Sequence, residues 1–308
     1  MIFDRWNERV AALRNPSIVG LDTHYGLLPA ELQARLEPAD KMASAADLIL
    51  TFNKGILDAL VDVVPCVKVQ IAFYEQYGWQ GYKAYVDTLQ YAKRLGYITI
   101  ADAKRNDIGS TAEAYATAFL GETDFGDKTI PAMEADLLTV NGYLGADGIE
   151  PFRKECVNRG KGIFVLVKTS NPGSGELQDK PMADDSTVYE TMADMVDNWG
   201  KGTQGKSGYQ AIGAVVGATY PQQGRDLRMR VPHIPFLVPG YGAQGAKATD
   251  VAQMFDENGF GAYVNASRSI ITAYQKSEKP YGEAALDAAI AMREDLLSAL
   301  SQAGRLGY

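Results

Sequence analysis

Short runs of β-branched and other apolar residues recur along the chain, and amphipathic stretches of helical length separate them. This alternation is typical of βα units that build a parallel sheet. Eight runs predict strands at residues 17–24, 66–72, 97–104, 137–142, 162–170, 211–219, 235–240 and 261–270. Eight strands with helices between them, in about 250 residues, indicate an α/β protein with a (β/α)8 TIM barrel. A doubly wound open sheet is the alternative.

Amphipathic segments predict helices at residues 41–63, 81–95, 111–120, 186–200 and 248–258, and a closing helix after Pro280. The third of these is predicted to begin at Ser110 or Thr111, because Glu113 follows at a capping distance. No linker or change in composition divides the chain, so residues 1–308 are expected to form a single barrel domain. The long connection between the fifth and sixth strands, residues 170–210, is expected to be a loop plus a helix within it.

Composition and charge narrow the class of protein. Hydrophobic residues make up 46% of the chain and charged residues 22%, as is usual for a globular protein. The 30 Lys and Arg residues against 38 Asp and Glu residues give a formal net charge of −8. This balance predicts no nucleic-acid partner, because binding a polyanion requires a surplus of cations. A local basic pocket for a small phosphorylated substrate remains compatible with this negative net charge.

Neither secretion, membrane insertion nor metal binding is indicated. Cys66 and Cys156 are expected in a strand and a helix and form no C-x-x-C pair, so we predict no disulfide framework and no thiolate zinc site. His24 and His233 are isolated and are expected to be loop or strand-end residues. The first ten residues carry four charges, and no uncharged apolar stretch long enough to span a bilayer occurs. We therefore expect a cytoplasmic protein in a reducing compartment, without a membrane partner.

A lysine interrupts the second predicted strand. Val67, Val69 and Ile71 occupy one face of that strand, and Lys68 and Gln70 occupy the other. Because the apolar face of a barrel strand packs against the helices, Lys68 is expected to point into the barrel.

Further charges extend this pattern at the C-terminal ends of strands, where barrels carry their active sites. Asp102 and Lys104 share one face of the third strand, roughly 7 Å apart along it. Asp22 lies near the end of the first strand, and Asp107 follows the third in a loop that can reach across a subunit boundary. The residues spell Asp-x-Lys-x-x-Asp at 102–107. Their signs alternate, which lowers the cost of burying them.

An alternating charge array has two interpretations. It could be a salt-bridge network that only fills the barrel mouth, but apolar residues would stabilise that position better. A group of buried ionisable residues at this end of a barrel therefore predicts catalysis.

Two segments match phosphate-binding patterns by their spelling. Residues 200–207 (GKGTQGKS) fit a P-loop, yet they follow a predicted helix and lead into a strand, whereas a P-loop follows a strand and opens a helix. Residues 240–245 (GYGAQG) follow the seventh strand without the acidic residue that a dinucleotide site needs. We expect the second segment to bind a phosphate and the first to bind no nucleotide.

The segment at residues 102–116, DAKRNDIGSTAEAYA, resembles the orotidine 5'-phosphate decarboxylase family, in particular the longer subgroup with the motif DAKRGDIGSTAEAYA. Asn106 replaces the usual glycine, and asparagine tolerates left-handed backbone angles well enough to keep the loop shape. Other matching segments are GLD with Asp22, VKVQIAFYE around Lys68, VKTSNPGS around Ser170, VPGYGAQG at 238–245 and NASRSI ending at Ile270. The resemblance therefore spans most of the chain.

The resemblance implies a reaction. Members of the family decarboxylate orotidine 5'-monophosphate to uridine 5'-monophosphate in pyrimidine synthesis, on a (β/α)8 barrel that forms a homodimer without metal or organic cofactor. It implies that Lys104 protonates C6 of the pyrimidine and that Asp102 lies against the departing carboxylate. It also implies that Lys68 and Asp22 bind ribose hydroxyls within the catalytic charge network.

The remaining implied roles concern the partner subunit, the base and the phosphate. Asp107, a catalytic residue, and Thr111, a substrate ligand, would reach into the site of the partner subunit. The other implied ligands are Ser170 for the pyrimidine amide, Pro239 in the loop that closes over the site, and Gln244 and Arg268 for the phosphate.

These roles are chemically consistent. A C6 carbanion has no adjacent carbonyl to delocalise it, so a fixed ammonium is the available stabiliser. The carboxylates at Asp102 and Asp107 favour the charged form of Lys104 by proximity. Lys168 lies on the same face of the fifth predicted strand as Ser170 and is assigned no role. The aromatic residues from Phe73 to Trp79 are expected to serve packing or a dimer contact.

Three other functions remain open. A related sugar-phosphate enzyme would use the Asp-x-Lys-x-x-Asp segment to hold magnesium, although Lys68 on the second strand would repel a cation. An aldolase would form a Schiff base through Lys104. A catalytically silent nucleotide-binding barrel would keep only the fold.

Overall fold

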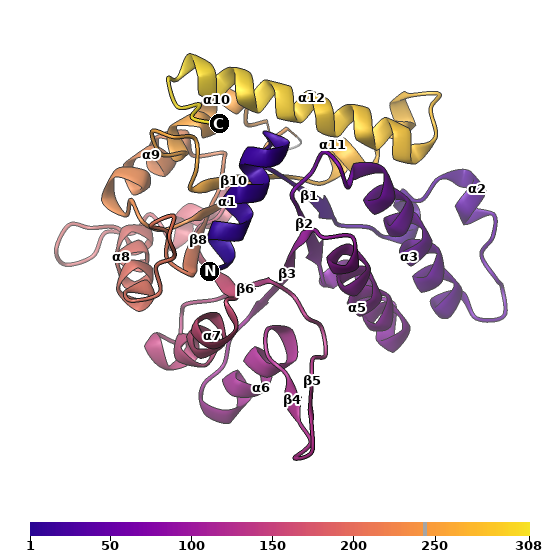
Figure 1. The fold of residues 1–308 in the computed structure, drawn as a ribbon, viewed down its shortest axis with the longest axis horizontal. Helices are drawn as coiled ribbons and strands as arrows, with labels where there is room; N and C mark the ends of the chain where they lie inside the picture. Colours follow the sequence, from indigo (N-terminus) through magenta and orange to yellow (C-terminus); the bar gives the residue numbers. More distant parts are fainter. Residues whose placement is uncertain (243–244) are drawn as a thin grey trace.

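Eight parallel strands close into a barrel in the computed structural model, which describes residues 1–242 and 245–308 (Figure 1). The strands follow one another around the barrel as β1 (Ser17–Leu21), β10 (Ala262–Ala266), β9 (Phe236–Pro239), β8 (Ile212–Val216), β7 (Gly162–Lys168), β6 (Leu137–Val140), β3 (Ile98–Arg105) and β2 (Cys66–Gln70). Closure is direct, because Ser17 of β1 pairs with Val264 of β10. The (β/α)8 prediction is confirmed, and the open-sheet alternative is wrong.

Helices cover the outside of the barrel (Figure 1). The longer ones are α3 (Lys41–Leu60), α5 (Gly78–Arg94), α6 (Gly109–Phe119), α7 (Ala146–Arg159), α8 (Val188–Gly200), α9 (Pro221–Arg230) and α12 (Tyr281–Gln302). Short helices are α2 (Ala30–Gln33), α4 (Ala72–Glu75), α10 (Ala248–Val251) and α11 (Arg268–Ile271), and 3-10 turns lie at Tyr25–Leu27, Pro172–Glu176, Ala252–Met254 and Ala273–Lys276. The connection at 170–210 thus contains a loop and a helix, α8, as expected.

Several predicted boundaries differ from the structure, including the following three. Helix α6 begins at Gly109 rather than at Ser110 or Thr111, because glycine adopts the positive φ of 54° that turns the chain into the helix. The strand predicted to reach residue 270 ends at Ala266, and Arg268 opens α11 instead of ending a strand. The helix predicted at 248–258 is only α10 followed by a 3-10 turn.

Alternation along the strands separates the two cores as predicted. Val67, Val69 and Ile71 belong to the large cluster between the strands and the helices. Lys68 points the other way and is buried inside the barrel. Apolar residues of the same inward parity, such as Ile98 and Phe164, fill the N-terminal half of the interior. The C-terminal half contains the charged side chains Lys68 and Asp102 together with apolar ones such as Leu166 and Val215.

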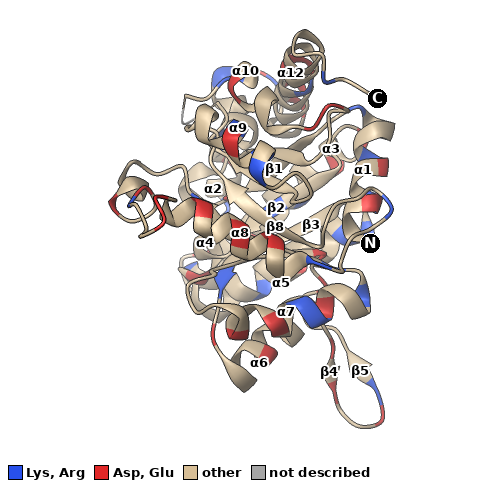
Figure 2. Ribbon diagram, turned by 90° about the vertical axis from the view of Figure 1, so that its left-hand side faces the viewer, with Lys and Arg blue, Asp and Glu red and all other residues tan. Residues whose placement is uncertain are grey.

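An N-terminal helix that the sequence pattern did not reveal closes the other end of the barrel. Helix α1 (Ile2–Leu13) buries Phe3 and Trp6 against the inward apolar residues of the strands. The Trp6 ring stacks on Tyr263 of β10 with centroids 3.7 Å apart, and the Tyr263 hydroxyl donates to Asn7 at 2.6 Å. Figure 2 shows α1 at one end of the barrel and α2 and α4 at the opposite end. The barrel is therefore open at one end only.

Two further segments complete the description. A hairpin of β4 (Thr123–Asp124) and β5 (Thr129–Ile130), which was not predicted, extends away from the barrel between α6 and β6 (Figure 1). At residues 200–207 the Ser207 amide donates to the Asp4 carboxylate at 2.8 Å. The backbone of this segment thus donates to a carboxylate of α1. Within the described ranges no helix is long and apolar enough to cross a membrane.

Candidate active site

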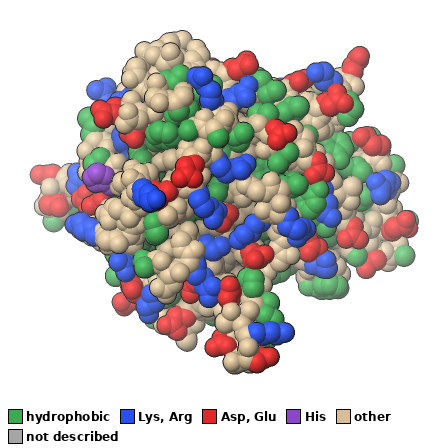
Figure 3. All heavy atoms as spheres, in the orientation of Figure 1, with side chains coloured by type: hydrophobic (Ala, Val, Ile, Leu, Met, Phe, Trp, Pro, Cys, Tyr) green, Lys and Arg blue, Asp and Glu red, His purple; other side chains and the backbone are tan. Residues whose placement is uncertain are grey.

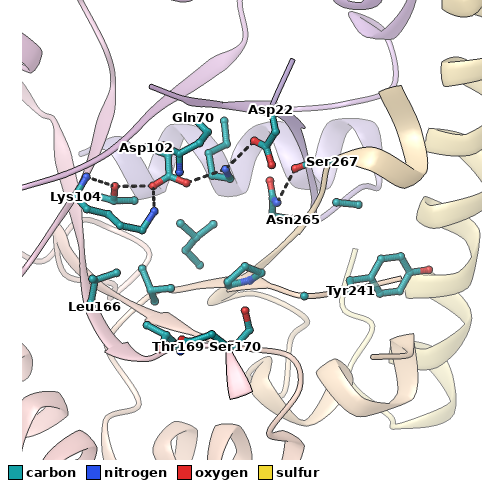
Figure 4. A pocket seen from close by; sticks show the side chains of 18 of the residues that line it. Asp22, Gln70, Asp102, Lys104, Leu166, Thr169, Ser170, Tyr241, Asn265 and Ser267 are labelled. Atoms are coloured by element: carbon teal, nitrogen blue, oxygen red, sulfur yellow. Dashed lines mark hydrogen bonds and ion pairs between the residues drawn. The ribbon is translucent and has the colours of Figure 1, made fainter. Parts of the chain in front are cut away.

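A cavity of about 360 Å³ opens at the C-terminal ends of the strands (Figure 4). Most of the predicted site residues line it, namely Asp22, Lys68, Asp102, Lys104, Ser170, Pro239 and Arg268. They come from β2, β3, β9, the segments that follow β1 and β7, and the start of α11. The barrel thus brings together side chains that are up to 246 residues apart in sequence, from position 22 to position 268.

A chain of ion pairs crosses one wall of the cavity (Figure 4). The Lys68 ammonium lies 3.4 Å from an Asp22 oxygen and 2.8 Å from Oδ2 of Asp102. The second oxygen of Asp102, Oδ1, lies 2.6 Å from the Lys104 ammonium. The predicted alternation of charge is therefore present as contacts, with Asp102 between two lysines.

Electrostatic interactions keep Asp102 and Lys68, at the centre of this row of ion pairs, in their charged forms. Burial alone would raise the pKa of the Asp102 carboxyl, but the ammoniums of Lys68 and Lys104 outweigh it and hold the pKa well below its usual range. Burial would likewise lower the pKa of Lys68, yet Asp102 and Asp22 raise it above its ordinary value. Both Asp102 and Lys68 are consequently charged at neutral pH.

The backbone of Lys104 has an unusual conformation. Its φ is 48°, in the left-handed region that a lysine enters at a cost of order 1–3 kcal/mol. From Ala101 to Arg105 the strand β3 uses four steps against two on β6, so the sheet register shifts here. Thr139 of β6 fixes this bend, because its Oγ1 accepts from the amides of both Ala103 and Lys104 at 3.0 Å.

The same threonine also orients the carboxylate. The Thr139 hydroxyl donates to Oδ1 of Asp102 at 2.9 Å, the oxygen that faces Lys104. One side chain thus sets both the backbone under Lys104 and the direction of Asp102. The side chain of Lys104 is 45% exposed, and its remaining N–H donors face the cavity.

Several lining residues escaped the sequence analysis as site residues. Thr139, Gln70, Asn265 and Ser267 have the inward parity of their strands, so alternation could have found them. Gln70 was placed on the same face as Lys68 without a role. Phe73, which belongs to the aromatic segment expected to serve packing or a dimer contact, packs against the core and also lines the cavity. The remaining lining residues are Thr169, Asn171, Leu166, Val215, Leu237, Gly240, Tyr241 and Ala266.

Two predicted residues are not part of this wall. Asp107 and Thr111 do not line the cavity of their own chain. The Asp107 carboxylate accepts from the adjacent Ile108 amide at 2.8 Å, and Thr111 is an exposed residue of α6. Gln244 lies outside the described residues.

The far end of the cavity is suited to an anion. Gly240 and Gly242 have φ values of 106° and 72°, conformations that glycine adopts at little cost, and Gly240 lines the cavity. Arg268 at the start of α11 is exposed and forms no ion pair with the described part of the chain. Its guanidinium is free to pair with a phosphate. No group of three or more potential metal ligands occurs among residues 1–242 and 245–308.

A closed parallel barrel with an alternating carboxylate and ammonium array in its open end defines a (β/α)8-barrel enzyme. Residues 41–280 match the family described as Orotidine 5'-phosphate decarboxylase / HUMPS family, and the chain belongs to this family.

Individual relatives agree along nearly the full chain. A Rhodopirellula baltica protein named orotidine 5'-phosphate decarboxylase is 46% identical over 270 residues, 87% of this chain and 88% of the relative. A Clostridium perfringens protein of the same name is 40% identical over 303 residues, 97% of this chain and 99% of the relative. The crystal structure of a putative orotidine 5'-phosphate decarboxylase from Streptomyces avermitilis is similar with a TM-score of 0.77 and 32% identity, covering 97% and 96% of the two chains.

Proposed function

We propose that this protein is a carboxy-lyase that decarboxylates orotidine 5'-monophosphate to uridine 5'-monophosphate in pyrimidine synthesis. The observation that carries the proposal is the ammonium of Lys104, held on a left-handed backbone and paired with a buried, ionised Asp102. Relatives that bear the decarboxylase name at 40% and 46% identity support it.

In the proposed reaction the bond between C6 and the carboxylate carbon breaks and carbon dioxide leaves. The electron pair stays on C6, and Lys104 donates a proton to it, so that solvent must reprotonate the amine afterwards. The fixed ammonium stabilises charge where it develops. Asp102, next to the departing carboxylate, needs no reorganisation because Lys68 and Thr139 already hold it.

Substrate binding is assigned to three parts of the cavity. Asp22 and Lys68 would bind the ribose hydroxyls, and Ser170 would bind the pyrimidine amide. Arg268 would bind the phosphate, together with Gln244 and the loop that begins at Pro239. Binding energy from the phosphate would then help the chemical step at the other end of the substrate.

The proposed assembly is a homodimer with shared sites, in which Asp107 and Thr111 enter the partner's cavity. Large apolar side chains are exposed on the same side of the barrel as Asp107: Trp79 is 74%, Ile108 56% and Tyr143 80% exposed. They follow β2, β3 and β6, which are neighbours in the barrel. A second copy of the chain would bury this surface.

A direct assay tests the activity. The purified protein, pre-treated with a chelator, should consume orotidine 5'-monophosphate, followed as the fall in ultraviolet absorbance of the orotate ring. A flat trace would refute the proposal. Dependence on added magnesium would favour the sugar-phosphate alternative. Borohydride inactivation that requires substrate would favour a Schiff-base aldolase, and tight ATP binding without turnover would favour a silent nucleotide-binding barrel.

Mixing two inactive variants tests the shared site. Lys104→Ala removes the proton donor of one chain, and Asp107→Ala removes the residue proposed to act in the other chain. Random re-association should restore about a quarter of the wild-type activity, because half of the dimers are mixed and each mixed dimer has one complete site. The absence of recovery after confirmed subunit exchange would overturn the shared-site dimer.

Other parts of the proposal stay predictions. They are a cytoplasmic location, a single domain over residues 1–308, no cofactor, and no nucleic-acid or membrane partner. Both cysteines are buried and unbridged in the described structure, which is compatible with a reducing compartment.

A further inference from the structure

A completely buried lysine lies behind the cavity wall, outside the proposed mechanism. Lys168 ends β7, and its side chain has no exposed surface. It has the parity of the inward residues Phe164 and Leu166, but the register between β7 and β8 shifts after Leu166, and Lys168 does not line the cavity. The shift directs its ammonium to the long connection that follows β7.

The ammonium is enclosed by groups from the connection and the neighbouring helices. It lies 2.7 Å from Oδ1 of Asp179 and donates to Ser174 at 3.3 Å. It also lies 4.3 Å from the centre of the Tyr220 ring and 5.6 Å from that of Tyr189, as cation–π contacts. Lys168 thus ties the connection to the strand that precedes it.

Further hydrogen bonds connect the same segment to the cavity wall. The Gln178 side chain accepts from the Thr169 amide at 2.9 Å and donates to the Thr169 hydroxyl at 2.8 Å. Gln223 of α9 donates to Asp179 at 3.2 Å, so the carboxylate is held from two sides. Gln178 and Asp179 are adjacent in sequence, and one turn of chain therefore fixes both Lys168 and Thr169.

The wall that this turn supports faces the cavity. Thr169 and Ser170 lie along its lower edge in Figure 4, and Asn171 also lines it. Behind Ser170 there is no free space, because a Cβ on Gly217 would approach the Ser170 backbone to 2.8 Å. The Thr219 hydroxyl donates to the Ser170 carbonyl at 3.2 Å. Ser170 is therefore held by the segment that follows β8, and its neighbour Thr169 is held by the connection.

We propose that Lys168 is a positioning residue: its pair with Asp179 fastens the 170–187 segment so that Ser170 meets the pyrimidine amide of the substrate. This inference rests on the proposed function. The pair is asymmetric, since Lys168 has no exposed side-chain surface and Asp179 is 37% exposed. Release of Asp179 into water would leave a buried ammonium without its counter-charge, so the fastened state is strongly favoured. The wall is thus pre-organised before substrate arrives.

The test compares two ligands that differ in the group concerned. Uridine 5'-monophosphate contains the pyrimidine amide, and ribose 5-phosphate lacks it. In Asp179→Asn and Lys168→Met, the affinity for uridine 5'-monophosphate should fall about tenfold, as for loss of one well-placed hydrogen bond, and the affinity for ribose 5-phosphate should stay within about twofold. The KM for orotidine 5'-monophosphate should rise by a larger factor than kcat falls.

Matched variants control for general damage. Lys180→Met removes an exposed lysine of the same segment and should leave both affinities unchanged. Asp179→Glu keeps the charge and should recover most of the affinity for uridine 5'-monophosphate. Asp179→Asn alters the exposed partner, so it provides the comparison if Lys168→Met does not fold. Calorimetric titration and thermal unfolding are measured on every variant.

The outcomes separate this inference from the proposed function. A parallel loss of affinity for both ligands in Asp179→Asn would show a merely structural role and overturn the inference. Unchanged affinity for uridine 5'-monophosphate would also overturn it. If the wild-type protein binds the two ligands equally and does not decarboxylate orotidine 5'-monophosphate, the proposed function itself has failed.

Discussion

The two ends of the barrel each contain a buried carboxylate surrounded by cations, and they differ in how those cations use their hydrogen bonds. At the open end Asp102 lies between Lys68 and Lys104. The Lys104 side chain is partly exposed, and Asp102 is the only partner of its ammonium in the described part of the chain. The remaining N–H donors of Lys104 are available to a ligand in the cavity.

At the closed end the two lysines near Asp136 donate to the main chain rather than to the carboxylate. One oxygen of Asp136 lies 3.0 Å from Arg5 and 4.0 Å from both Lys93 and Lys161. The two lysines donate to main-chain carbonyl oxygens at 2.8 Å each. The other Asp136 oxygen accepts from the amide and hydroxyl of Thr99. Figure 3 shows this face, where Lys and Arg side chains gather near the middle.

A buried ion network is therefore not in itself a sign of catalysis. At each end a buried carboxylate accepts a hydrogen bond from a threonine hydroxyl. The donor is Thr139 at the open end and Thr99 at the closed end. Asp102 borders the cavity at the C-terminal ends of the strands, whereas Asp136 borders a hollow at the other end of the barrel that Arg5, Glu8 and Lys93 also line. Barrel enzymes carry their active sites at the C-terminal ends of the strands. The comparison predicts that changes at the open end alter turnover, and that changes at the closed end alter stability.

The largest effect is expected from Lys104→Ala. Loss of the proposed proton donor and of the fixed positive charge should lower kcat by at least about 10⁴-fold while the protein stays folded. Lys161→Met removes a lysine from the closed end and should leave kcat within about twofold, since it touches no substrate. Steady-state kinetics and circular dichroism measure both variants. Comparable activity losses in the two would abolish the distinction between the ends.

Asp136→Asn should be the most destabilising change at the closed end. It removes the counter-charge of Arg5, Lys93 and Lys161 and should lower the free energy of unfolding by about 3 kcal/mol, measured by urea denaturation. The kcat of the folded fraction should not change. Asp87→Asn breaks the exposed pair with Lys83 and should leave stability nearly unaltered. A loss of turnover in folded Asp136→Asn protein would contradict the assignment.

Thr139→Val and Thr99→Val compare the two hydroxyls directly. The first removes the acceptor for the Lys104 amide and a donor to Asp102, so kcat should fall about 10–100-fold. The second removes bonds to Asp136 and should cost about 1–2 kcal/mol of stability with kcat preserved. Kinetics and denaturation on both variants are required. The comparison fails if the two substitutions change the same property.

The smallest effect concerns pH. Burial and the neighbouring Lys93 ammonium lower the pKa of Lys161 from 10.5 to about 8, against the opposing attraction of Asp136. Between about pH 8 and pH 10.5 the unfolded chain binds more protons at this site than the folded one, so this lysine makes stability rise with pH in that window. The rise should be smaller in Lys161→Met than in the wild type, as followed by denaturation at several pH values. Equal slopes would contradict the lowered pKa.

Local pattern predicted the barrel because each strand has to bury an apolar face against helices. The same alternation correctly predicted that Lys68 points into the barrel. It also predicts inward side chains at Thr139 and Asn265, although neither residue has a charge that singles it out. The charges of α1 concealed a helix, although Ile2, Phe3, Trp6 and Val10 have helical spacing. The surface that α1 covers is formed by residues far along the chain, so the local pattern could indicate the helix but not where it packs.

Register shifts limited the prediction of the site. Alternation places Lys104 and Lys168 as ordinary inward residues, but Lys104 lies within a register shift between β3 and β6, and Lys168 lies at the end of one between β7 and β8. One shift directs an ammonium back to Asp102, and the other directs an ammonium out of the cavity wall. Such shifts depend on the pairing of two strands, which one sequence pattern does not encode. The roles of Asp107 and Thr111 depend on a second chain, which no local pattern describes.

The helix that closes the barrel has a consequence for synthesis. Asn7 and its partner Tyr263 are 256 residues apart, so α1 leaves the ribosome long before its binding surface exists. At about 5–20 residues per second the interval is about 13–50 s. During this time Phe3 and Trp6 have no native partner and are exposed to chaperones or to other nascent chains. Helix α1, which is made before the strands that it covers, is thus among the last elements to reach its final place, and the yield of folded protein should depend on translation speed.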